Sequence, residues 1–175
     1  ILPRSEVPEE FTWDLSHVFA SDDKWNEELE ALKAYPERMA AYAGKLGEGA
    51  KTLLDWFTLS DEINVRVSKF VQYASCRSDQ DVGNSFYQGM RSTAFSPAVA
   101  LNSAGSFEAS EIMAIPDETL ARFYAEEPKL ETYRRSIDKL RRRKAHILSP
   151  ECEKILAAAG AVSYTHLRAH ETVLD

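Results

Sequence analysis

The sequence predicts an all-α fold, a helical hairpin or bundle lobe, from three observations. Apolar residues recur at spacings of three and four in nearly every segment, which is typical of amphipathic helices. Alternation with a period of two, which would indicate strands, is nowhere sustained. The segment from about residue 50 to residue 79 contains neither proline nor glycine, so one long helix can run through it.

The first twenty residues contain two prolines and are expected to form an extended arm, 1–20. Ser21 is the predicted N-cap of the first helix, and the following Asp22 favours the positive end of the helix dipole. Gly44 and Gly47 are expected to end this helical region. Its apolar stripe, with a break expected at Pro36, consists of Trp25, Leu29, Leu32, Met39 and Tyr42.

The helix predicted over residues 50–79 would be about 45 Å long. Its apolar positions are Trp56, Ile63, Val67, Phe70 and Ala74. Such a helix must bury this face, and the expected partner is the next helix, which starts near Asn84. Gly89 and Pro97 make the extent of that second helix less definite.

Three further helical segments follow. Pro116 opens a short helix that is expected to end near Glu127-Pro128. A helical seam then consists of Leu130, Tyr133, Ile137 and Leu140. Ser149 is the predicted N-cap of a last helix that runs through Leu156.

Composition excludes several classes of function. The net charge of −7 argues against a nucleic-acid partner, because phosphate binding requires a basic excess. No apolar segment approaches the ~20 residues that span a bilayer, so no membrane partner is expected. Cys76 and Cys152 are interpreted as reduced thiols of a cytoplasmic protein. The chain starts without methionine or a signal region, so it is expected to begin inside a longer reading frame.

The pair His170-Glu171 resembles the first half of the zinc-peptidase motif H-E-x-x-H. The fifth position is Leu174, which cannot bind a metal, so the motif is incomplete. His166 and His170 are four residues apart and could contact one metal ion, which leaves a metal-binding module as an alternative. A frayed polar terminus is the preferred interpretation.

Other candidate sites are weaker. Asp79, Asp81 and Asn84 resemble part of a calcium loop, but the glycine and the glutamate that such a loop requires at its sixth and twelfth positions are absent. The basic run 141–144 is interpreted as a solvated helix end. Cys76 is expected to be a buried inert thiol.

His17 and His146 are interpreted as caps or surface groups. The sequence therefore predicts no catalytic, cofactor-binding or metal-ligating residue in this chain. The substrate-binding residues stay unknown. Tyr73 and Arg77 are candidates for lining a channel, although a packed tyrosine and a surface arginine are equally good interpretations.

Short sequence segments, in order and with consistent spacing over about residues 2–160, carry a family resemblance. These are Arg4-Ser5-Glu6-Val7-Pro8, Thr12-Trp13-Asp14-Leu15-Ser16, Phe19, Ser21-Asp22, Trp25, Gly44-Lys45-Leu46-Gly47, Tyr73-Ala74-Ser75-Cys76-Arg77-Ser78-Asp79, Asp81, Ala114-Ile115-Pro116, Glu127-Pro128, Leu130, Tyr133-Arg134, His146-Ile147-Leu148-Ser149, Glu151 and Glu153. Together they resemble the N-terminal region of oligoendopeptidase F, a cytosolic zinc metallopeptidase of the thimet-oligopeptidase-like group.

This resemblance implies the N-terminal part of a larger all-helical metallopeptidase, with residues 21–161 as a helical lobe. The lobe would form one wall of a deep cleft that admits short peptides, facing a catalytic domain whose H-E-x-x-H helix holds Zn²⁺. There the zinc would activate a water molecule for attack on the peptide carbonyl. The catalytic residues of the family would lie beyond Asp175, so this fragment should bind no zinc and be inactive alone.

Residues 162–175 depart from the family pattern and resemble a tail found on many unrelated predicted proteins. They are interpreted as a non-native segment, translated from adapter or vector sequence, which would make His170-Glu171 foreign to the family. The alternative function is a stand-alone helical interaction module without catalysis, in which the 50–79 helix binds a partner protein.

Overall fold

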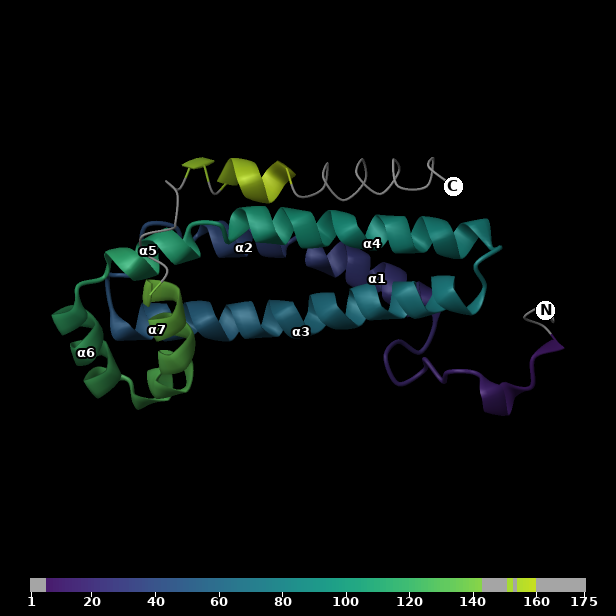
Figure 1. Cartoon of the computed structure of the whole chain (residues 1–175), viewed down its shortest axis with the longest axis horizontal. Helices are drawn as coiled ribbons and strands as arrows, with labels where there is room; N and C mark the ends of the chain where they lie inside the picture. Colours follow the sequence, from purple (N-terminus) through teal and green to yellow (C-terminus); the bar gives the residue numbers. More distant parts are fainter. Residues whose placement is uncertain (1–5, 143–150, 153, 160–175) are drawn as a thin grey trace. The chain divides into compact units, whose positions relative to one another are not determined.

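The computed structural model describes residues 6–142, 151–152 and 154–159, and these residues form helices, turns and irregular segments without a strand (Figure 1). The predicted all-α class is therefore confirmed. The chain divides into two compact units. The first comprises residues 1–34 and 64–98, and the second comprises residues 35–63 and 99–175.

The first unit begins with the arm, which contains the short 3-10 helix η2 (Glu9–Phe11), and continues into α1 (Asp22–Leu32). The Ser21 hydroxyl oxygen accepts a hydrogen bond from the Lys24 amide at 3.3 Å, as the N-cap prediction required. The unit also contains the C-terminal part of α3 (Ala50–Gln80) and the first part of α4 (Ser85–Ala104). These two parts lie side by side beyond the turn that joins them (Figure 1).

The core of the first unit is centred on Trp25 and Phe70. Their rings stack with centroids 4.3 Å apart, and the Trp25 indole N–H donates to the Phe70 carbonyl oxygen at 2.9 Å. Both side chains are buried, and burying a side chain of this size contributes about 1.5–3 kcal/mol. Because the indole N–H has a partner, this burial leaves no unpaired donor.

The second unit contains the remaining elements that the structure describes. It includes the first turns of α3 and the end of α4. Its complete elements are α2 (Tyr35–Ala40), α5 (Glu108–Ala114), α6 (Asp117–Glu126), the 3-10 helix η3 (Pro128–Tyr133) and α7 (Arg134–Arg142). Trp56 is fully buried among them, with the Tyr42 and Phe107 rings beside it. Gly105 is close to this cluster, and a Cβ there would lie 2.8 Å from the Met39 methyl carbon.

The structure refines the predicted elements in three places. Pro36 lies in the first turn of α2, where its missing N–H would have no helical acceptor anyway. Helix α4 runs through both Gly89 and Pro97. The segment expected to be one helix from Leu130 starts as η3 and becomes α-helical only at Arg134.

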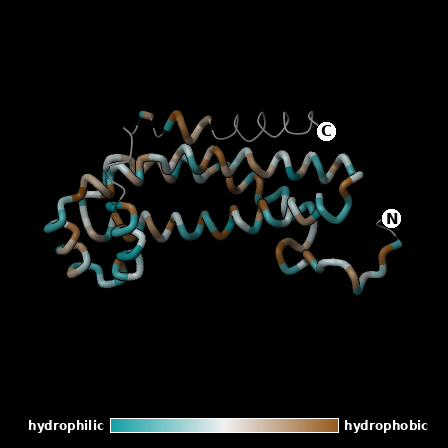
Figure 2. Tube along the Cα trace, viewed as in Figure 1, coloured by the Kyte–Doolittle hydropathy of each residue, from teal (hydrophilic) through white to brown (hydrophobic). Residues whose placement is uncertain are grey.

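Apolar residues are scattered along the long helices. Figure 2 shows polar residues breaking up the apolar stretches of α3 and α4. Over the described part of the chain, no helix combines the length and apolar content required to cross a membrane.

Candidate functional site

The first unit contains an open cavity of about 1130 Å³. The arm supplies one side, and α1, the end of α3 and the start of α4 supply the rest. Its aromatic lining residues are Trp13, Phe19, Tyr73 and Tyr87, and its charged lining residues are Asp14, Asp22, Arg77 and Asp81. Three carboxylates and one guanidinium give the lining an excess of negative charge.

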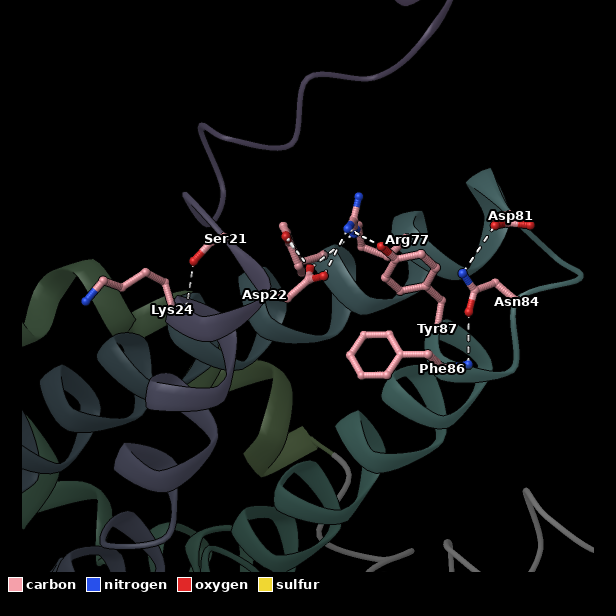
Figure 3. A network of polar contacts seen from close by, with 9 residues as sticks. Ser21, Asp22, Lys24, Arg77, Asp81, Asn84, Phe86 and Tyr87 are labelled. Atoms are coloured by element: carbon pink, nitrogen blue, oxygen red, sulfur yellow. Dashed lines mark hydrogen bonds and ion pairs between the residues drawn. The ribbon is translucent and has the colours of Figure 1, made fainter. Parts of the chain in front are cut away.

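Asp22 is the centre of the polar network in this cavity (Figure 3). Its Oδ1 accepts hydrogen bonds from the Tyr73 hydroxyl at 2.7 Å and from Arg77 Nε at 3.2 Å. Its Oδ2 accepts a third from Arg77 Nη2 at 2.9 Å. Arg77 Nη2 also donates to the Tyr87 hydroxyl, so the network connects α1, α3 and α4.

Two pKa values reflect this network. Burial raises the pKa of Tyr73 from 10.0 to about 12, and the hydrogen bond to Asp22 acts in the same direction. For Arg77, burial alone would lower the pKa, but the hydrogen bonds and charge contact with Asp22 raise it above its usual value. Tyr73 therefore stays neutral and Arg77 stays charged over the physiological range.

The other lining carboxylates are also engaged. Asp14 Oδ1 accepts the Ser16 amide at 2.9 Å, and hydrogen bonds from the Ser16 side chain and from this amide lower the Asp14 pKa. Asp81 Oδ2 accepts the Asn84 side-chain amide at 3.3 Å. Because these groups already have partners, the cavity offers shape, aromatic faces and polar contacts more than a proton-transfer centre.

The structure places Tyr73 and Arg77, the two channel-lining candidates, in this cavity. Both line the cavity, but their polar atoms bind Asp22. Sequence analysis singled out these two residues and missed the acceptor that joins them. The sequence places Asp22 in the first turn of a helix and in a family-like segment, but its contact with Arg77 spans 55 residues of sequence.

The weaker candidates have partners of their own. Asp79 binds Arg91, with Oδ1 and Nη1 2.7 Å apart. The Cys76 thiol is buried, and its Sγ accepts the Gln72 amide at 3.1 Å. His17 is exposed, with Nε2 3.5 Å from an Asp14 oxygen. Within the described ranges, no three His, Cys, Asp or Glu side chains gather in a way that could hold a metal ion.

Arg141 has a more specific role than a solvated helix end. Its Nη1 donates to the carbonyl oxygens of Ile112 at 3.0 Å and Ile115 at 2.6 Å, and its Nη2 pairs with Asp117. Arg141 thus holds the end of α5 against α7, while Arg142 is exposed. The remaining predicted residues, His146, His166 and His170, lie outside the described residues, as does the proposed tail.

Comparison with known proteins finds similarity to oligoendopeptidase F. A family model described as oligopeptidase F matches residues 111–172, a span that includes part of the proposed tail. Oligopeptidase PepF of Bacillus subtilis is 37% identical over 159 residues, which are 91% of this chain and 24% of that protein. The plasmid-encoded oligoendopeptidase F of Lactococcus lactis subsp. cremoris is 34% identical over 160 residues, 91% of this chain and 27% of that protein.

Solved structures agree with the sequence comparison. The crystal structure of oligoendopeptidase-F from Enterococcus faecium matches with a TM-score of 0.72 and 31% identity, over 81% of this chain and 28% of that chain. A Chlamydophila abortus protein shares the fold at 22% identity, with a TM-score of 0.74. The chain therefore spans about a quarter of the length of the relatives it matches.

Proposed function

This chain is a relative of oligoendopeptidase F and corresponds to its N-terminal region, and from this premise we propose that it is the N-terminal lobe of an enzyme that hydrolyses short peptides. The observation that carries the proposal is 37% identity over nine-tenths of this chain to a protein named oligopeptidase PepF. The similarity extends to a solved oligoendopeptidase-F at a TM-score of 0.72.

In the proposed enzyme the metal ligands come from outside this lobe. The described residues do not fit a zinc site, because no three potential ligands gather among them. When bound in the full-length enzyme, zinc would supply Lewis-acid activation of water. The contribution of this chain would be shape and polar contacts along one wall of the peptide cleft.

The cavity around Asp22 is the part of the lobe that best fits a role in that wall. It is open, about 1130 Å³ in volume, and bordered by aromatic faces and hydrogen-bonding groups that suit an extended peptide. We place the enzyme in the cytoplasm, because a reduced thiol such as that of Cys76 suits a reducing compartment.

A direct assay tests the expectation that the lobe is inactive alone. The purified chain, supplied with Zn²⁺, is incubated with quenched-fluorescence peptides, and we expect no turnover above the metal-only control. The Bacillus subtilis relative serves as the positive control. Turnover by the chain that disappears with a chelator would contradict the proposal.

A chimera tests whether this lobe supports peptide cleavage in a full-length enzyme. Residues 1–161 replace the corresponding N-terminal region of the Bacillus subtilis relative, and we expect chelator-sensitive peptide cleavage to persist. The matched control is the same relative with this region deleted, which should lose cleavage. A folded chimera, judged by circular dichroism and sedimentation, that cleaves no peptide would show that the lobe does not serve this function.

A further inference from the structure

A second pocket lies in the second unit, between α3, α5 and α7. Its volume is about 270 Å³. Four apolar side chains line it: Phe57, Ile112, Ile137 and Leu140. Two charged residues, Glu108 and Lys139, complete the lining that matters here. The pocket is therefore a mostly apolar depression that contains one negative and one positive group.

Glu108 is the partly buried carboxylate of this pocket. It begins α5 and its Oε2 accepts a hydrogen bond from the Trp56 indole nitrogen at 3.1 Å. Burial raises the pKa of the Glu108 carboxyl, and the Trp56 hydrogen bond offsets only part of this effect. A carboxylate that is partly buried beside one neutral donor carries part of its desolvation cost, and a ligand cation in the pocket would offset that cost.

Lys139 supplies the opposite charge from a different helix. It lies on α7, is exposed, and lines the same pocket as Glu108. The pocket thus has no net charge, which disfavours both a simple cation and a simple anion as ligand. Its two charges best complement a molecule that carries an ammonium and a carboxylate together.

The volume of the pocket limits the size of the ligand that can bind. Drug-sized ligands occupy pockets of roughly 300–1,000 Å³. At about 270 Å³ this pocket suits a smaller molecule. Its apolar lining favours an aliphatic or aromatic side chain over a polar one.

We propose that this pocket binds the zwitterion of an apolar amino acid. The ammonium pairs with Glu108, the carboxylate pairs with Lys139, and the side chain packs on Phe57 and the isoleucines. This inference is independent of the peptidase proposal, because it concerns binding by this chain alone. Ion pairs with the two charged groups on the ligand's α-carbon supply specificity, while the apolar contact with its side chain supplies most of the affinity.

Calorimetric titration of the full chain with L-leucine tests the proposal. We expect a dissociation constant on the order of 1 mM, as befits a ligand of this size. Two analogues each lack one charge: 3-methylbutylamine has no carboxylate, and 4-methylpentanoate has no ammonium. Each should bind roughly tenfold more weakly, because it loses one charge-assisted contact.

Variants test which residues are responsible. Glu108→Gln retains an acceptor for the Trp56 N–H but removes the charge, and Lys139→Gln removes the opposite charge; each should weaken leucine binding roughly tenfold. Lys129→Gln, at another exposed lysine, is the matched control and should bind as the unchanged chain does. Thermal unfolding of each variant confirms that it is folded.

A spectroscopic signal locates the ligand. The Trp56 indole N–H donates to Glu108, so leucine should shift the Trp56 indole N–H resonance, and the resonances of Trp13 and Trp25 in the first unit serve as the comparison. The proposal is overturned if leucine does not bind, if either analogue binds as well as leucine, or if binding survives both charge-removing substitutions unchanged.

Discussion

The carboxylate of Asp22 accepts three hydrogen bonds from two side chains of α3, and its partner Arg77 is only partly exposed. Asp22→Asn removes the charge and leaves the guanidinium without a counter-ion, so we expect a loss of about 2–3 kcal/mol in the free energy of unfolding. Urea denaturation measures this loss.

The neighbouring Asp23 provides the control for Asp22. Asp23 lies in the same first turn of α1 but is exposed, so Asp23→Asn loses only the favourable interaction with the helix dipole, less than about 1 kcal/mol. Equal effects of the two substitutions would mean that the network around Asp22 contributes nothing beyond the helix dipole.

Tyr73 makes the stability of the fold sensitive to alkaline pH. Its pKa is raised from 10.0 to about 12 in the folded state, so the folded state holds its proton more tightly than the unfolded state. The resulting stability is fully present below pH 10 and is lost as the pH rises to about 12, by at most about 3 kcal/mol.

Tyr73→Phe isolates this effect. Below pH 10 the variant should be about 1 kcal/mol less stable, because it lacks the hydrogen bond to Asp22. Between pH 10 and 12 the difference should shrink and then reverse sign, since only the unchanged chain loses stability by deprotonation at this position. Denaturation curves at several pH values provide the measurement, and parallel pH profiles for both proteins would refute the assignment.

Sequence predicted individual site residues only in part. Tyr73 and Arg77 could be singled out, because an aromatic and a cation one turn apart share a helix face. Their acceptor could not, since no local pattern links Asp22 to residues 51 and 55 positions away. Glu108 was missed for the same reason, because its environment comes from the distant Trp56 and α7.

At the scale of elements, the loop between α2 and α3 depends on Gly44. This residue has φ of +82°, and its amide donates to Glu111 Oε1 at 2.6 Å. A Cβ at Gly44 would meet nothing within 4 Å, so Gly44→Ala should cost about 1–2 kcal/mol for conformational reasons alone. Thermal and urea unfolding measure this cost.

Gly89 in α4 provides the contrast to Gly44. A Cβ there also meets nothing within 4 Å, but the backbone is helical, so Gly89→Ala should stabilise the chain by about 0.5–1 kcal/mol. The opposite signs of the two substitutions separate backbone strain from side-chain packing. A neutral Gly44→Ala would show that the left-handed conformation is not required in solution.

The elements themselves were predictable to different degrees. Helix α3 was found almost to the residue, because its apolar period is long and uninterrupted. The sequence does not predict helix α5, because this helix has only seven residues and no side-chain N-cap. Burial of its residues Ile112 and Met113 stabilises it instead. The sequence predicts an α-helix for the η3 segment, because apolar spacings of three suit both helix types.

At the scale of the whole molecule, family membership could be predicted while the position of any chemistry could not. The resemblance depends on many short matches whose order and spacing agree, and comparison with known oligoendopeptidases confirms it. The chain matches about a quarter of each relative's length. In the proposed enzyme, catalysis would depend on residues in the other three-quarters. A sequence that covers one lobe can therefore specify a fold and a family without specifying an active site.

Exposed apolar side chains in the first unit predict self-association. In the first unit, Val82 in the turn before α4 and Phe86 at the start of α4 are 75% and 59% exposed, and such apolar surface is normally covered by a partner. We expect the chain to form reversible oligomers, measurable as a rise in weight-average mass with concentration in sedimentation equilibrium.

Replacing both residues, Val82→Ser with Phe86→Ser, should weaken this association at least about tenfold, because burial of the phenylalanine alone contributes about 1.5–3 kcal/mol. Val65→Ser, which changes an exposed valine on α3, is the matched control and should leave association unchanged. Circular dichroism should show the same helix content in all three proteins. If the unchanged chain stays monomeric at every concentration, then these side chains are not an interaction surface, and the lobe tolerates their exposure to water.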